Sequence, residues 1–144
     1  MGKRAFAFVI AWVATYVLAV AAATQSILAY LEGLGREVTF AERLEAIGHD
    51  IAGMVIPYGA IIGLAMVVAY GVVALIVRNR QGLRLPGYVL GGFTAVLAIH
   101  LGLRLAFDMN PVWATTTPLG LILQGLAGAV GGYVFFRLNS PKPA

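Results

Sequence analysis

Four long apolar segments constrain this chain more than any other feature, and they lie at residues 5–30, 47–77, 86–107 and 112–137. Each reaches the ~20 apolar residues that an α-helix needs to cross a hydrocarbon core of ~30 Å. The chain is 60% hydrophobic and 11% charged, whereas a soluble domain has about 25% charged residues. The sequence therefore predicts an all-α membrane protein, a four-transmembrane-helix up-down bundle.

The first apolar segment also has features of a cleavable signal peptide. Two basic residues precede it, and three alanines stand at 21–23, where small residues suit a cleavage site. Its apolar stretch, 5–23, is however longer than a signal core of ~7–15 residues. We therefore expect a retained helix, so that residues 1–144 form a single transmembrane domain.

The charges of the loops are distributed unevenly. Loop 31–46 has four glutamates against two arginines, a net charge of −2, whereas loop 78–85 has three arginines and no acidic residue. Both termini are basic. Because cytoplasmic loops carry the excess of Lys and Arg, this pattern predicts N-in/C-in helices in a bacterial inner (cytoplasmic) membrane. It also explains the net charge of +4 without a nucleic-acid partner.

The second helix is expected to start before its apolar segment and to cover about 40–77. Thr39 and Glu42 have the spacing of a capping box, in which both side chains bond to free amides at a helix start. A straight helix of this length would extend ~57 Å, well beyond the membrane. We therefore expect a bend near Gly53 or Pro57.

Small residues recur at the spacing that lets membrane helices approach closely. We expect them to pack the helices within one bundle, with a homo-oligomeric seam as the alternative and membrane lipids as the other partners. The pairs are Gly59/Gly63, Gly87/Gly91 and Gly128/Gly132.

Polar residues gather at the end of the helices that is expected to face outward, and the inner half has no comparable group. Ionisable residues inside a membrane usually turn inward, pair with one another or line a wet cavity. We predict that Asp50 pairs with Arg104 and that the group lines a pocket open to the outside or to the outer leaflet. A purely structural role, with each residue satisfied inside the protein, is the alternative. The candidate ligand-binding residues are His49, Asp50, Tyr58, His100, Arg104, Asp108 and Gln124.

Such a pocket would bind a small molecule or a lipid headgroup, and the chain would be an accessory protein or a subunit of a membrane complex. One alternative is a redox protein in which His49 and His100 are the axial ligands of haem b. Another is a divalent metal bound by both histidines and Asp50 or Asp108, although no metal-ligand motif supports it. A third is an enzyme whose histidine acts as general base while Arg104 holds an anionic headgroup. The absence of cysteine excludes disulfides and thiol chemistry.

Overall fold

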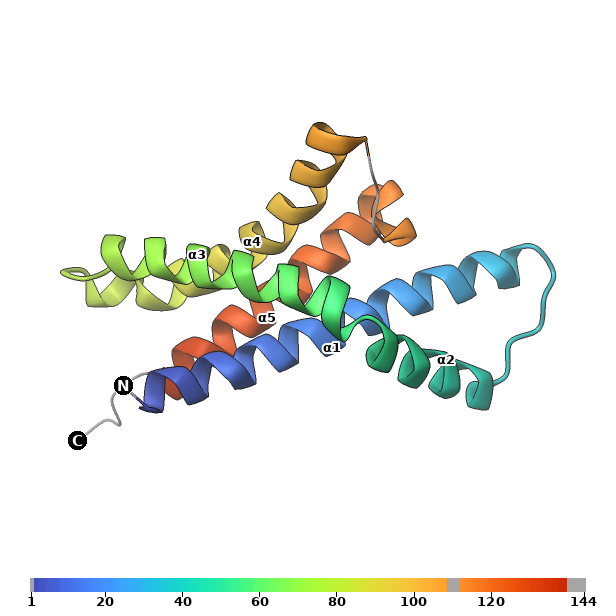
Figure 1. The fold of residues 1–144 in the computed structure, drawn as a ribbon, viewed down its shortest axis with the longest axis horizontal. Helices are drawn as coiled ribbons and strands as arrows, with labels where there is room; N and C mark the ends of the chain where they lie inside the picture. The colour runs from blue at the N-terminus through green and yellow to red at the C-terminus, as the bar shows by residue number, and fades with distance from the viewer. Residues whose placement is uncertain (1, 109–111, 140–144) are drawn as a thin grey trace.

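The computed structural model describes residues 2–108 and 112–139, and every element of regular structure in these ranges is helical. Short helical turns at Val55–Gly59 (η1, a π-helix), Gln81–Leu83 (η2) and Trp113–Thr116 (η3) lie between the longer helices. Figure 1 shows the arrangement. The five α-helices are α1 (Gly2–Gly33), α2 (Phe40–Gly53), α3 (Ala60–Ile76), α4 (Arg84–Phe107) and α5 (Pro118–Asn139).

Four helical segments are long and apolar enough to cross a membrane. They are α1, α3 with its preceding η1 turn, α4 with η2, and α5. Their outer faces carry large apolar side chains such as Leu75 and Leu105, which are 75% and 86% exposed. So much exposed apolar surface is unfavourable in water and is suited to contact with lipid tails. The predictions of an all-helical chain and of four helices long and apolar enough to cross a membrane are confirmed for the described residues.

Glycines set the distance between α4 and α5, the two helices that pack most extensively. A Cβ atom at Gly92 would lie 2.1 Å from the Gly128 carbonyl oxygen, and a Cβ atom at Gly132 would lie 2.0 Å from that of Tyr88. Of the predicted small-residue pairs, Gly128/Gly132 therefore serves contacts within the chain. Gly87 and Gly91 lie instead against side chains of Val73 and Val77 on the α3 side.

The helix predicted over 40–77 is interrupted between Gly53 and Gly59, where a bend is expected from the sequence. α2 ends at Gly53, and the amides of Tyr58 and Gly59 both donate to the Met54 carbonyl, at 3.0 and 3.1 Å. Pro57 has no N–H to continue the regular ladder, so the chain takes one wider π-turn before α3 begins. The result is two helices at an angle, with the α2 segment lying against the second half of α1 (Figure 1).

The capping box at the start of α2 is present as predicted. The Glu42 carboxylate accepts from the Thr39 amide at 2.7 Å, and the Glu42 amide donates to the Thr39 hydroxyl at 3.3 Å. The backbone amide of Thr39, and then its hydroxyl, hold the pKa of the Glu42 carboxyl below its usual value.

The fourth transmembrane helix starts later than the predicted residue 112. Thr117 is extended, at φ −99° and ψ 145°, and α5 begins at Pro118. A residue before proline avoids the helical conformation, and proline itself suits the first helical position. Residues 113–116 therefore form the separate η3 turn rather than the first turn of α5.

Substituting Gly128 by alanine should separate α4 from α5, because its Cβ would lie 2.1 Å from the Gly92 carbonyl oxygen. We expect a loss of ~1–3 kcal/mol or more, as in other overpacked sites. Thermal unfolding in detergent measures it. Gly102→Ala is the matched control, since Gly102 is also helical and its Cβ would meet nothing within 4 Å. Equal unfolding temperatures for the two variants would contradict the close approach.

Candidate functional site

A buried chain of hydrogen bonds joins three of the seven predicted site residues. The Tyr58 hydroxyl lies 2.9 Å from His100 Nε2 and donates to Gln124 Oε1 at 2.7 Å. Gln124 Nε2 in turn donates to the Ala19 carbonyl at 2.8 Å. Tyr58, His100 and Gln124 are 3%, 2% and 0% exposed, respectively. The network therefore ties η1, α4 and α5 to α1.

The direction of these bonds follows from the Ala19 carbonyl, which can only accept. It fixes Gln124 with its NH₂ toward α1 and its oxygen toward Tyr58. The single hydroxyl proton of Tyr58 goes to that oxygen, so His100 must donate its Nε2–H to Tyr58. His100 Nδ1 is then a bare acceptor, and it is buried with no partner among the described residues.

Asp50 does not pair with Arg104, so that prediction is wrong. Asp50 Oδ2 accepts from the Thr24 hydroxyl at 2.7 Å, and Asp50 Oδ1 lies 3.5 Å from His49 Nδ1. The second half of α1 supplies the partner because α2 folds back against it. Arg104 is exposed on the outer part of α4 and makes no ion pair within residues 2–108 and 112–139.

The other predicted site residues are not gathered in one pocket. The His49 side chain is 85% exposed, whereas His100 is buried and its Nε2 already bonded to Tyr58. These different surroundings give no support to the two histidines as a haem ligand pair. Asp108 is exposed and ends α4 in a left-handed conformation, at φ 51°. Within the described ranges, no group of three His, Cys, Asp or Glu side chains could hold a metal ion.

A cavity of about 510 Å³ lies at the opposite end of the helices, where sequence analysis expected no site. All four membrane-crossing segments contribute to it: the start of α1, the end of α3, the η2 turn with the start of α4, and the end of α5. We call it the basic-end cavity. Its lining residues are Arg4, Tyr70, Gly71, Ala74, Val77, Arg78, Gln81, Arg84, Tyr88, Phe135 and Asn139.

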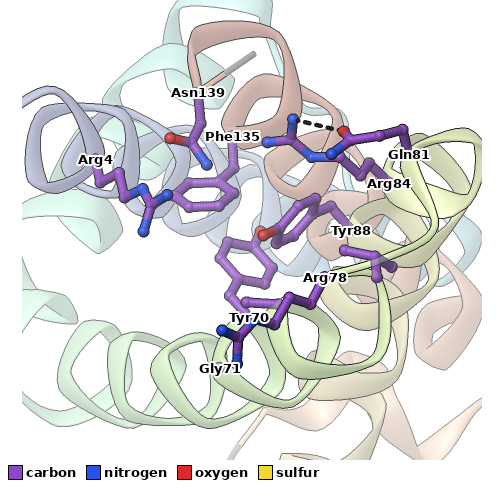
Figure 2. Close-up of a pocket in the computed structure, with 11 residues that line it drawn as sticks. Arg4, Tyr70, Gly71, Arg78, Gln81, Arg84, Tyr88, Phe135 and Asn139 are labelled. Carbon is purple, nitrogen blue, oxygen red and sulfur yellow. Dashed lines mark hydrogen bonds between the residues drawn. The ribbon is translucent and has the colours of Figure 1, made fainter. Parts of the chain in front are cut away.

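Three arginines line the basic-end cavity, and no described residue of the lining is acidic. Arg4, Arg78 and Arg84 line it from three different segments (Figure 2). The Arg43–Glu32 and His49–Asp50 ion pairs lie on α1 and α2, away from this end. The cavity is therefore a region of concentrated positive charge with low-dielectric walls, which raises the local concentration of anions.

Aromatic rings form the floor of the basic-end cavity. The Tyr70 ring centroid lies 4.8 Å from that of Phe135 and 5.6 Å from that of Tyr88. These spacings are typical of packed aromatic pairs. Tyr70 is 4% exposed, and its hydroxyl has no hydrogen-bond partner among the described residues. The rest of the rim carries amides, with Gln81 Oε1 accepting from Arg84 Nη1 at 3.4 Å.

Sequence reasoning missed this cavity because each of its signals has a simpler explanation. Arg78 and Arg84 satisfy the positive-inside bias, and a tyrosine near a helix end suits the membrane interface. The one available signal was the spacing of tyrosines: Tyr70 lies eight residues before Arg78, and Tyr88 four residues after Arg84. Comparison with known proteins adds nothing to this, since no family model, curated protein or solved structure matches the chain.

Tyr58→Phe should destabilise the protein by ~1–3 kcal/mol for each stranded polar group, because it leaves His100 Nε2–H and Gln124 Oε1 buried without partners. Thermal unfolding in detergent tests this, with the half-exposed Tyr133→Phe as control. Combining Tyr58→Phe with Gln124→Leu should cost less than the sum of the two single changes. Strict additivity would show that the bond is not formed.

Proposed function

We propose that this chain is a multi-pass protein of a bacterial inner membrane, with both termini in the cytoplasm, that binds an anionic headgroup or small anion in its basic-end cavity. The observation that carries the proposal is the set of three arginines around a cavity of about 510 Å³, with no acidic side chain among the described residues that line it. In this orientation the cavity faces the cytoplasmic leaflet, whose anionic lipids attract basic groups.

The guanidinium groups suit an anion with several oxygens. Arg presents a planar fork of donors that matches carboxylate and phosphate geometry, and it stays charged at every physiological pH. The Gln81 amide adds a donor, since its oxygen faces Arg84 and leaves the NH₂ group available. The aromatic and aliphatic floor gives an apolar surface beside these charges, as an amphiphile requires.

The cavity is better suited to binding than to catalysis. The described residues that line it include no histidine, carboxylate, serine or cysteine, so they offer neither a common general base nor an activated nucleophile. We therefore propose an accessory protein or complex subunit rather than an enzyme. The outward pocket predicted for the seven polar residues is less favoured, because Tyr58, His100 and Gln124 use their polar atoms largely on one another.

Another cavity, of about 540 Å³ between α3 and α4, is a weaker candidate. Its lining is almost wholly apolar, and its one hydroxyl, Thr94, already donates to the Leu90 carbonyl at 2.8 Å. A lipid tail could cover this surface, but no polar group there would orient a specific ligand.

The proposed orientation predicts which loops an impermeant thiol reagent can reach in intact cells. The chain has no cysteine, so single cysteines at Glu37 and Gly82 report on one loop each. Glu37→Cys should be labelled in intact cells, and Gly82→Cys only after the membrane is permeabilised. The reverse pattern would place the basic-end cavity on the outer face.

The binding proposal predicts that Arg4→Gln, Arg78→Gln and Arg84→Gln each weaken anion binding about tenfold. A hydrogen bond to a charged group is worth ~1.5–3 kcal/mol, and 1.4 kcal/mol corresponds to tenfold. Titration of short-chain phosphatidic acid, phosphatidylglycerol and inorganic pyrophosphate into protein in uncharged detergent measures this. Arg104→Gln, on α4 but outside the cavity lining, is the control. Equal binding by all four variants would refute the site.

A further inference from the structure

The hydroxyl of Tyr70 is an unused donor beneath the basic-end cavity. It is buried and has no partner in the described part of the chain. A buried hydroxyl that forms no hydrogen bond loses its hydration without compensation. Phenylalanine would fill the same volume without that penalty, so packing alone does not explain a tyrosine at this position.

The Tyr70 ring cannot easily turn its hydroxyl toward water. It is confined by Phe135 and Tyr88 and, on another side, by Phe8, whose ring centroid lies 6.3 Å away. Tyr70 therefore lines the cavity with its hydroxyl held in place, and Arg4, Arg78 and Arg84 line the same cavity (Figure 2). An anion held by the arginines would bring an acceptor oxygen to this donor.

The number and direction of the donors distinguish between kinds of phosphate. A phosphodiester has two unesterified oxygens and one negative charge. A terminal phosphate has three such oxygens and a charge of about −1.5 to −2 at neutral pH. Arginines from α1, from the turn after α3 and from the start of α4 line the cavity, together with Tyr70 of α3. Donors on several sides fit an anion with three free oxygens.

Building on the proposed anion-binding function, we infer that the basic-end cavity selects a terminal phosphate, either a phosphomonoester or a diphosphate, over a phosphodiester, and that Tyr70 is the specificity-determining residue. The arginines provide attraction for either kind of anion. The Tyr70 hydroxyl adds a hydrogen bond only for a headgroup that has a free oxygen left for it when its other oxygens are bound by the arginines. A phosphorylated lipid and a soluble phosphate compound share this chemistry.

Tyr70→Phe tests the inference because it removes one oxygen and leaves the arginines in place. Dissociation constants are measured in uncharged detergent for short-chain phosphatidic acid, a monoester, and short-chain phosphatidylglycerol, a diester. We expect the parent protein to prefer the monoester about tenfold, which corresponds to 1.4 kcal/mol, and Tyr70→Phe to lose most of that preference. Tyr133→Phe, on the half-exposed surface of α5, should keep it.

The outcomes separate the two levels of the proposal. Equal affinity for both lipids, or a preference unchanged by Tyr70→Phe, overturns the selectivity and leaves anion binding intact. If the arginine substitutions leave the dissociation constants of the anions unchanged, the anion site itself is overturned. Inorganic pyrophosphate distinguishes the sources: competition with phosphatidic acid indicates recognition of the phosphate alone, whereas a lipid that pyrophosphate cannot displace indicates an amphiphile. Matching unfolding temperatures of parent and Tyr70→Phe exclude a folding defect.

Discussion

The structure depends on the backbone contact between α4 and α5. Gly92, Gly128 and Gly132 leave no room for a Cβ atom between the two helices. In a membrane the surrounding lipid is as apolar as the helices, so close van der Waals packing replaces the hydrophobic drive of a soluble core. The same contact brings His100 toward Gln124 at one end of the pair and Tyr88 toward Phe135 at the other. Both polar regions of the protein thus depend on three glycines.

Much of the fold could be predicted from the sequence because the length needed to cross a membrane is a simple constraint. The four crossing segments, the break before α3 and the Thr39 cap follow from local rules. The start of α5 was misplaced because hydrophobicity extends through Val112 and Trp113, whereas the backbone restriction imposed by Pro118 decides the boundary.

The candidate site was harder to predict because the hydropathy of the sequence does not determine how each helix is rotated or tilted. Hydrogen bonds join Tyr58, His100 and Gln124, and the burial of these side chains depends on how α4 and α5 rotate about the glycines. The predicted pairing of Asp50 with Arg104 rests only on their similar expected depth in the membrane. In the structure α2 folds against α1, so Asp50 accepts a hydrogen bond from Thr24 instead. The basic-end cavity requires four chain segments to meet, and no local pattern encodes that meeting.

The one-way order of the buried hydrogen bonds has a consequence for the protonation of His100. Because the Ala19 carbonyl can only accept, reversing the Gln124 amide would set two acceptors against each other and leave Tyr58 facing a donor. The contact with α1 therefore also decides which nitrogen of His100 carries the proton: with Gln124 held in this order, Tyr58 has no proton left for His100, and Nε2 must carry one.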